Sequence, residues 1–471
     1  MFPKQVFKVY DIRGLTEGEL SEDLAYRIGR AYGVFLRESS TVIPIRQSAG
    51  EESLKVVVGQ DMRATSPKYA KEVIRGLNDE GLNVVDIGLA STPLFNFACT
   101  FYPEHLAGIM VTASHNPAQY NGFKMTLHDG TPVGGKTGMD TIRDLAEKNE
   151  WTSANAENVI PAKAGIQASI TQKDVFPDYL NKILSIVKPE EIKPLKIVID
   201  AGNGMAAVTF VELLKKLPVQ VEYLFLKPDG NFPNHEANPL KTETLKTLQE
   251  KVKATGADFG FALDGDADRM GLVDENGEVV EASFVGALAG LEILREHPGV
   301  HMLYDLRSSK IQKEVWEANG ATTGMCPVGH ANIKKMMKDQ KAEFASELSL
   351  HLYFHSMCDV ESTDLALLYF LRLLSRSGKK LSELIAPLKK YFHSGEINFK
   401  VADKEKVLNN LRVQYGDAKI TELDGLSFEY PTWWFNVRAS NTEPVLRLNL
   451  EADTKGEMEE KLVNVKNIIN G

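Results

Sequence analysis

Two short strings of residues hold the side chains that phosphoryl transfer requires. In Met110–Pro117 (MVTASHNP) an apolar run ends in a polar turn that contains one serine, Ser114. In Asp264–Arg269 (DGDADR) three carboxylates occupy alternating positions and an arginine follows them. A hydroxyl can carry a phosphoryl group, and clustered carboxylates are the ligands that hard divalent cations prefer. Together the two strings predict phosphoryl transfer assisted by a divalent cation.

The acidic string favours a magnesium site over two alternatives. Alternation in an extended loop directs Asp264, Asp266 and Asp268 to one side, where their like charges are costly unless a cation neutralises them. An EF-hand is one alternative, but Arg269 stands where that loop needs glycine, and the preceding segment looks like a strand. The other alternative is an acidic surface loop that binds no metal.

The serine string also has simpler interpretations. Ser114 or Asn116 could cap a helix that follows the turn. A hydrolytic Ser–His dyad is disfavoured, because Ser114 and His115 are neighbours in the sequence and no Gly-x-Ser-x-Gly elbow surrounds them. The complete string after an apolar run is more specific than a lone serine.

Further polar strings are candidates for binding a substrate. Glu347–His351 (ELSLH) has groups that hydrogen-bond sugar hydroxyls, although a helix N-cap is equally consistent with it. Arg438–Pro444 (RASNTEP) suits a phosphate, or is a surface turn. Phe7–Gly14 (FKVYDIRG) supplies Arg13 as a fixed positive charge, or is only a strand and turn. His330 by itself is structural.

A weak internal repeat predicts the elements that position these strings. Each repeat has three strand-like runs with helix-compatible segments between them, and the third run opens into a polar loop. This order predicts α/β domains with mixed sheets, whose ligand sites lie beyond the strand ends. The expected strands are Lys55–Gly59, Asn83–Ile87 and Ala107–Val111; Lys196–Asp200, Gln220–Phe225 and Asp258–Leu263; and His301–Asp305, Ala321–Cys326 and Glu343–Ala345.

The chain is too long for one hydrophobic core. Its 471 residues predict three or four domains. A polar, small-residue stretch at 150–173 indicates a linker or insertion, and the repeat stops near residue 390, where an α+β pattern closes with an amphipathic helix at Thr454–Ile469. We expect α/β domains at 1–152, 153–276 and 277–389, and a smaller α+β domain at 390–471.

Composition excludes several classes of function. A formal net charge of −10 argues against a general nucleic-acid binder. The three cysteines are far apart and form no metal or redox pair. No apolar run reaches the length of a membrane span, and the first residues lack the core of a signal peptide. We therefore expect a cytoplasmic protein with no nucleic-acid or membrane partner.

The N-terminal, serine, metal, sugar and phosphate strings, in this order, resemble the α-D-phosphohexomutase superfamily, and within it the bacterial phosphomannomutase/phosphoglucomutase group. The resemblance covers essentially the whole chain. It implies four domains around a central active-site cleft and an isomerase of carbohydrate metabolism, acting as a monomer or dimer on small phosphohexoses. It further implies reversible transfer between the 1- and 6-positions through a phosphoserine and a hexose 1,6-bisphosphate, which also serves as activator.

The resemblance assigns roles to residues at matching positions. Ser114 is the phosphorylated serine, and its phosphate joins Asp264, Asp266 and Asp268 around Mg²⁺. Lys124, Arg13 and His330 are candidates for proton transfer and charge stabilisation. The other implied positions are Tyr10 and His115 near the reacting phosphate; Arg269, Arg307, Glu347, Ser349 and His351 at the substrate; and Arg438, Ser440, Asn441 and Thr442 at the non-reacting phosphate.

Details within these strings bear on the sugar. The N-terminal string has the phosphomannomutase/phosphoglucomutase form, and Leu348 and Asn441 disfavour a phosphoglucosamine mutase. Ser346 and Leu350 replace two glycines of the family's sugar loop, so their side chains could alter its backbone or narrow the sugar site. We expect mannose and glucose phosphates as substrates. The alternatives are a phosphoglucosamine mutase, a metal-dependent sugar phosphatase, and a non-catalytic sugar-phosphate-binding paralogue.

Overall fold

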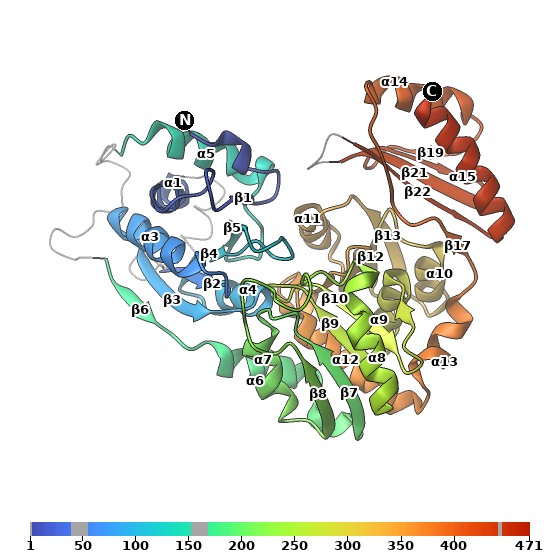
Figure 1. Ribbon diagram of the computed structural model, residues 1–471, viewed down its shortest axis with the longest axis horizontal. Coiled ribbons are helices and arrows are strands. Elements are labelled where there is room, and N and C mark those ends of the chain that lie inside the picture. Colours follow the sequence, from blue (N-terminus) through green and yellow to red (C-terminus); the bar gives the residue numbers. More distant parts are fainter. Residues whose placement is uncertain (1, 39–54, 152–167, 441–444) are drawn as a thin grey trace. The chain divides into compact units, whose positions relative to one another are not determined.

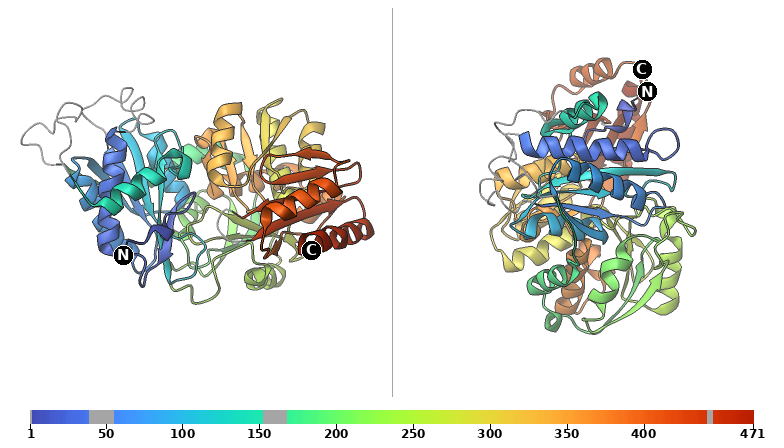
Figure 2. Two further views of the ribbon diagram at one scale, coloured as in Figure 1. Left: turned by 90° about the horizontal axis from the view of Figure 1, so that it is seen from above. Right: turned by 90° about the vertical axis from the view of Figure 1, so that its left-hand side faces the viewer.

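The computed structural model describes residues 2–38, 55–151, 168–440 and 445–471 (Figures 1 and 2). Three α/β domains follow one another along the chain and a smaller α+β domain ends it, which confirms the predicted fold class. By their contacts the residues form two compact units. Unit 1 comprises Met1–Val280 and Leu350–Leu381, and unit 2 comprises Glu281–Ser349 and Ser382–Gly471.

The first domain is built on a six-stranded mixed sheet in the order β1-β5-β4-β2-β3-β6. Strands β4, β2, β3 and β6 are parallel, whereas β5 is antiparallel to both β4 and β1. Its core packs apolar faces of α1, α3 and α5 against the sheet. The elements are β1 Ile12–Leu15, α1 Glu22–Glu38, β2 Lys55–Gln60, α3 Ser66–Asp79, β3 Asn83–Leu89, α4 Thr92–Phe101, β4 His105–Val111, β5 Tyr120–Leu127, α5 Met139–Lys148 and β6 Ile170–Gln172.

The second domain also belongs to unit 1 and has five strands in the order β11-β10-β9-β7-β8. Strands β9, β7 and β8 are parallel, and β10 turns back antiparallel to β9. Its elements are α6 Phe176–Ile186, β7 Leu195–Asp200, α7 Ala206–Leu214, β8 Val219–Leu224, α8 Lys246–Thr255, β9 Phe259–Leu263, β10 Met270–Asp274 and β11 Val279–Val280.

The third domain contributes to both units. In unit 2, β12 pairs in parallel with β13 and β14, and α9, α10 and α11 accompany them. In unit 1, β15 pairs antiparallel with β16, and α12 follows. The elements are α9 Ala282–Glu296, β12 His301–Asp305, α10 Lys310–Ala318, β13 Thr322–Cys326, α11 His330–Gln340, β14 Phe344–Ser346, β15 Leu352–Phe354, β16 Val360–Glu361, α12 Thr363–Ser377 and α13 Leu381–Ile385.

The C-terminal domain is an antiparallel sheet with two helices on one face (Figures 1 and 2). Its core includes stacked Phe428 and Phe435 rings, whose centroids are 4.5 Å apart, and residues of both helices. Such stacked aromatic packing contributes beyond the area that it buries. The elements are β17 Phe392–His393, β18 Ile397–Phe399, α14 Lys404–Gln414, β19 Lys419–Thr421, β20 Leu426–Glu429, β21 Trp433–Ala439, β22 Leu446–Ala452 and α15 Lys455–Asn470.

The predicted repeat is confirmed to within one or two residues at most strand ends. All nine expected strands are present as β2, β3 and β4; β7, β8 and β9; and β12, β13 and β14. The predicted final helix is α15, whose N-cap Thr454 accepts a hydrogen bond from the Glu457 N–H at 3.2 Å.

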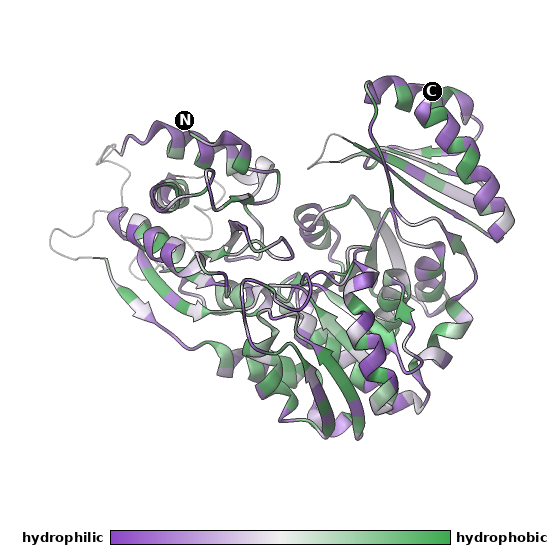
Figure 3. Cartoon of the chain, viewed as in Figure 1, coloured by the Kyte–Doolittle hydropathy of each residue, from purple (hydrophilic) through white to green (hydrophobic). Residues whose placement is uncertain are grey.

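Hydropathy explains why these segments form these elements. Strand β7 is largely hydrophobic, whereas α15 alternates hydrophilic and hydrophobic residues along its length (Figure 3). This is the difference expected between strands inside a sheet and a helix that covers one. Among the described residues, no helix is both long and apolar enough to cross a bilayer.

Candidate active site

Ser114 lies in the loop that joins β4 to β5 in unit 1. Its φ angle is 50°, a left-handed conformation that residues with a side chain seldom adopt. Its N–H donates to the Thr112 hydroxyl at 2.9 Å, and the residue is almost fully buried. A strand follows the loop, so the alternative of a helix cap is wrong.

Arg63, which the sequence analysis did not identify, holds this loop in place through hydrogen bonds to its main chain. Its guanidinium donates to three main-chain carbonyls of the loop, those of Ser114 at 2.8 Å, Asn116 at 2.6 Å and Pro117 at 2.8 Å, and to the carbonyl of Tyr120, the first residue of β5, at 3.0 Å. Its Nε donates to Asp61 at 3.1 Å. A planar fork of five N–H donors is the one side chain that can satisfy this many acceptors at once.

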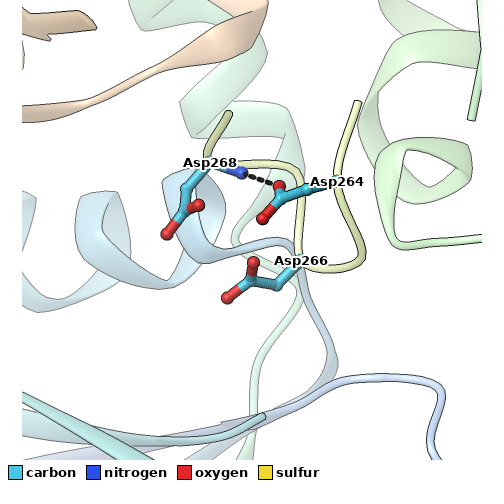
Figure 4. A group of neighbouring side chains, drawn as sticks. All are labelled: Asp264, Asp266 and Asp268. Atoms are coloured by element: carbon cyan, nitrogen blue, oxygen red, sulfur yellow. Dashed lines mark hydrogen bonds between the residues drawn. The ribbon is translucent and has the colours of Figure 1, made fainter. Parts of the chain in front are cut away.

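The acidic loop joins β9 to β10, and the strand before it rules out an EF-hand. Asp264, Asp266 and Asp268 are buried, and their side chains turn toward one another (Figure 4). One carboxylate oxygen from each lies within 4.8 Å of the other two. The loop also approaches the serine loop closely, because a Cβ on Gly265 would lie 2.5 Å from the Ser114 carbonyl oxygen. Ser114 Oγ donates to Asp264 at 2.8 Å.

The three carboxylates repel one another and are partly neutralised by Lys124 of β5. Burial, and next the charges of Asp268 and Asp266, raise the pKa of Asp264 well above its ordinary value. The Lys124 ammonium donates to Asp266 at 2.7 Å and to Asp268 at 2.6 Å. Burial would lower the pKa of Lys124, but these two carboxylates raise it well above its ordinary value, so Lys124 stays charged.

These residues fit a divalent cation. Oδ1 of Asp266 is buried and accepts no hydrogen bond from any described residue, although its other oxygen accepts several. An open, buried carboxylate oxygen is costly without a positive partner. The lysine ammonium already shows that this position takes positive charge. The cluster can therefore hold a metal ion, and its all-oxygen donors suit Mg²⁺.

His115 contacts Ser114, and Arg13 contacts the serine loop at Asn116. His115 Nδ1 lies 3.2 Å from Ser114 Oγ. Burial, with smaller contributions from Arg269 and Arg13, lowers the pKa of His115 well below its ordinary value, so the ring is neutral. Arg13 in β1 donates to the Asn116 side chain at 2.7 Å and to Asp11 at 2.5 Å.

The structure divides the predicted sugar string between the two units. His351 belongs to unit 1, where its Nε2 accepts from Arg269 Nε at 3.2 Å and lies 3.3 Å from Asp268 Oδ1. It therefore contacts the metal loop. Glu347 and Ser349 belong to unit 2.

In unit 2, Arg307 contacts the sugar string. It follows β12 and donates to Asp305 at 2.6 Å and to Glu347 at 3.5 Å. Glu347 also accepts the Gly329 N–H at 3.2 Å, which places the loop before His330 beside the sugar string. Burial would lower the pKa of Arg307, but Asp305 and then the other carboxylates raise it, so its charge is permanent.

Glu396, in the segment between β17 and β18, joins Arg307 to the phosphate string. Its carboxylate lies 3.4 Å from Arg307, 3.0 Å from Arg438 and 3.2 Å from Arg447. Burial would raise the pKa of Glu396, but the three guanidiniums hold it below its ordinary value. No sequence signal marks Glu396, because a single glutamate in a connecting segment belongs to no motif.

Five further predicted site residues lie in turns, at element ends or outside the described part of the chain. Tyr10 lies in the turn before β1, His330 begins α11, and Ser440 follows β21; all three are partly exposed. Asn441 and Thr442 lie outside the described residues.

The two residues that replace glycines in the sugar string behave differently. Ser346 is buried and its hydroxyl contacts Gln312 of α10, while Gly286 of α9 leaves room for it. Its side chain therefore points into the interior of the domain. Leu350 has a φ of 71°, so it adopts the left-handed conformation for which glycine is favoured.

A signal in the sequence could have identified Arg63. An aspartate lies at the end of each repeat's first strand or directly after it, and its carboxylate accepts the N–H two residues later: Asp61 from Arg63 at 3.0 Å, Asp200 from Gly202 at 2.9 Å and Asp305 from Arg307 at 2.7 Å. In the first and third repeats an arginine occupies that later position. The Asp-x-Arg spacing found at Arg307 therefore recurs at Arg63.

Comparison with protein families covers most of the chain. Residues 4–153, 177–277 and 282–391 match, in turn, α/β/α domains I, II and III of the family described as phosphoglucomutase/phosphomannomutase. Residues 396–467 match the C-terminal domain of the same family.

Individual relatives match over nearly their whole length. A phosphomannomutase of Methanocaldococcus jannaschii is 38% identical over 98% of this chain and 97% of its own. A phosphomannomutase/phosphoglucomutase of Pseudomonas syringae pv. tomato is 35% identical over 98% of this chain and 94% of its own. A crystal structure of a phosphoglucomutase/phosphomannomutase family protein from Burkholderia thailandensis superposes with a TM-score of 0.87 at 30% identity, covering 99% of this chain and 97% of that one.

Proposed function

Since the chain belongs to the phosphoglucomutase/phosphomannomutase family and is therefore a mutase, an enzyme of the isomerase class, we propose that it moves a phosphoryl group reversibly between the 1- and 6-positions of mannose and glucose phosphates. In this proposal Ser114 carries the phosphoryl group and a hexose 1,6-bisphosphate is the intermediate. The names of the relatives support both sugars, because they include phosphomannomutases and phosphomannomutase/phosphoglucomutases.

One observation supports the chemistry more than any other. Ser114 Oγ, in a strained and buried loop, donates to Asp264 within a cluster of three carboxylates. A hydroxyl has no structural need of such a costly environment, whereas a phosphoserine beside a divalent cation does. The same arrangement explains why strain is retained at this residue.

Asp264, Asp266 and Asp268, with the phosphate on Ser114, would hold Mg²⁺. When bound, the ion would neutralise charge on the transferring phosphoryl group, which is the main requirement of such reactions. Lys124 at the metal loop and Arg13 at the serine loop supply further positive charge. His115 is neutral and within reach of Ser114 Oγ, so it is a candidate to accept the hydroxyl proton. His330 of unit 2 is a second candidate for this role.

The other residues of the proposal hold the part of the substrate that does not react. Glu347 and Ser349 read the sugar 3- and 4-hydroxyls, and Arg438 with Ser440, Asn441 and Thr442 binds the second phosphate. Arg269, Arg307, His351 and Tyr10 complete the contacts. Mannose and glucose differ at C2, so a site that reads C3 and C4 accepts both. Because Ser346 points away into its domain, its side chain does not narrow such a site.

The decisive experiment is ³¹P NMR of the purified protein with Mg²⁺ and a trace of glucose 1,6-bisphosphate. Mannose 1-phosphate, glucose 1-phosphate and glucosamine 1-phosphate are supplied separately. The proposal expects 6-phosphates from the first two sugars. Inorganic phosphate alone would identify a phosphatase, turnover of glucosamine 1-phosphate alone a phosphoglucosamine mutase, and binding without turnover a non-catalytic paralogue.

Ser114→Ala tests the phosphoserine. The variant keeps the fold but has no group to carry the phosphoryl, so sustained turnover should disappear and intact mass should show no phosphate on the protein. Turnover near the wild-type rate would refute the phosphoserine mechanism.

Cytoplasmic location, and a monomeric or dimeric state, stay predictions that fractionation and light scattering would test.

A further inference from the structure

Helix α4 of the first domain begins directly against the metal loop of the second domain. Ser91 caps the helix by accepting the Leu94 N–H at 3.3 Å. The next residue, Thr92, makes two hydrogen bonds to Asp266, which lies 174 positions later in the chain. Its N–H donates to the Asp266 carbonyl at 2.8 Å, and its hydroxyl donates to Asp266 Oδ2 at 2.7 Å. Both the backbone and the carboxylate of Asp266 are thereby fixed.

The two oxygens of Asp266 consequently have different surroundings. Oδ2 accepts from Thr92, from Lys124 at 2.7 Å and from Thr112 at 3.4 Å. Oδ1 is buried and accepts no hydrogen bond within the described part of the chain. A carboxylate that is free to rotate could present either oxygen to a ligand, so the donors on Oδ2 select Oδ1 as the one left for a cation.

Among those donors, Thr92 is the one suited to orient a metal ligand. Lys124 carries a positive charge that competes with any cation for the carboxylate. The Thr112 hydroxyl is farther away and also accepts the Ser114 N–H. Thr92 is neutral, close, and anchored at the rigid start of a helix.

We propose that Thr92 is a positioning residue for the divalent cation, which sets the Asp266 carboxylate so that Oδ1 is presented to it. This inference rests on the metal site of the proposed function, and Thr92 itself contacts neither substrate nor metal. Hydrogen-bond partners that orient a ligand typically contribute 10- to 100-fold to metal affinity. It follows that the affinity of the second domain's metal loop depends on a residue of the first domain.

The test is a titration of the full-length protein with Mn²⁺, which prefers oxygen ligands and reports its binding directly by electron paramagnetic resonance. No sugar phosphate is present, and phosphoserine content is matched by intact mass. Thr92→Val removes the hydroxyl but keeps the shape and the main-chain bond, and Thr92→Ser keeps the hydroxyl. Thr100→Val is the matched control, because Thr100 lies on the same helix and its hydroxyl donates to the helix carbonyl of Asn96 at 3.0 Å.

The Mn²⁺ dissociation constant should rise about 10- to 100-fold in Thr92→Val and change less than about 2-fold in Thr92→Ser and Thr100→Val. Equal affinity of Thr92→Val and wild type would overturn the inference. So would an equal loss in Thr92→Ser, because the hydroxyl would then not be the cause. If the wild-type protein bound no Mn²⁺, the metal site itself would fail, which is a separate outcome.

Discussion

Ser114 is held in its strained conformation by neighbours on every side of the residue. The Thr112 hydroxyl accepts its N–H, Arg63 donates to its carbonyl, and Asp264 accepts from its hydroxyl. A left-handed conformation at a residue with a side chain costs about 1–2 kcal/mol. Such a conformation persists only where the surrounding contacts impose it. As a result the hydroxyl is fixed relative to the carboxylates. Arg63 contributes most to this, because it binds three carbonyls of the loop and that of Tyr120 directly after it.

Arg63→Lys should therefore reduce activity while the protein still folds. Lysine keeps the charge beside Asp61 but cannot reach four carbonyls, so the serine moves from its place; a displacement of about 1 Å can lower kcat about 100-fold. The Michaelis constant for the hexose phosphate should change little. Steady-state kinetics, with circular dichroism as a check of the fold, measures both quantities. Arg75→Lys is the matched control, because Arg75 on α3 is exposed and pairs with Glu72. A wild-type kcat in Arg63→Lys would show that the conformation of the serine loop does not depend on the Arg63 guanidinium.

At the scale of elements, helix starts position the metal loop. The start of α4 holds Asp266 through Thr92, and the start of α12 holds the loop through the Thr363 hydroxyl, which donates to the Ala267 carbonyl at 2.6 Å. The first residues of α12 also include Asp364, which accepts from the Tyr179 hydroxyl of α6 at 2.8 Å. Unit 1 therefore joins a helix of the third domain to the second domain by buried polar contacts.

Asp364 predicts a dependence of stability on pH. Burial raises the pKa of Asp364 to about 6, so between its ordinary value and that value the native state binds a proton that the unfolded state has lost. Stability therefore falls as the pH rises through this window, by about 3 kcal/mol at most. Asp364→Asn keeps an acceptor for Tyr179 and removes the charge. Its melting temperature should exceed that of the wild type by a few degrees at pH 8, and by less at pH 5.

Differential scanning fluorimetry at the two pH values measures this difference. Asp417→Asn is the matched control, since Asp417 accepts from the Tyr430 hydroxyl at 2.7 Å in an exposed position. An Asp364→Asn variant that is no more stable at pH 8 than at pH 5, relative to wild type, would contradict the assignment.

At the scale of the whole molecule, the candidate residues form two sets. Unit 1 contains the groups proposed to perform the chemistry, which are the serine, the three carboxylates, Lys124, Arg13, His115, Arg269 and His351. Unit 2 contains Arg307, Glu347 and Arg438 in a network completed by Glu396, which are the groups proposed to hold the substrate. The two sets should be separable by mutation.

Arg438→Ala tests that separation. Loss of a charge-assisted bond to the second phosphate, about 1.5–3 kcal/mol, should raise the Michaelis constant for glucose 1-phosphate about 10- to 100-fold. The Mn²⁺ affinity of unit 1 should stay at its wild-type value. Arg412→Ala, on α14 of the same domain and paired with Glu422 at the surface, is the control. An unchanged Michaelis constant would remove Arg438 from the phosphate site.

The sequence by itself determined the strands of the three repeats, the final helix and the two loops that bear Ser114 and the three aspartates. These features follow from local patterns, because apolar runs form buried strands and polar turns end them. The sequence also predicted Arg307, Glu347 and Arg438 as separate candidates.

Only the tertiary structure decided which side chains orient those candidates. Arg63, Thr92 and Glu396 act through hydrogen bonds and ion pairs to residues far away in the chain. The Asp-x-Arg spacing could mark Arg63 as a candidate, but no local pattern reveals the distant partners of these three residues. The strain at Ser114 and Leu350, and the direction of the Ser346 side chain, likewise depend on packing. Backbone strain and the choice of hydrogen-bond partner are set by contacts between elements, which sequence spacing alone does not specify.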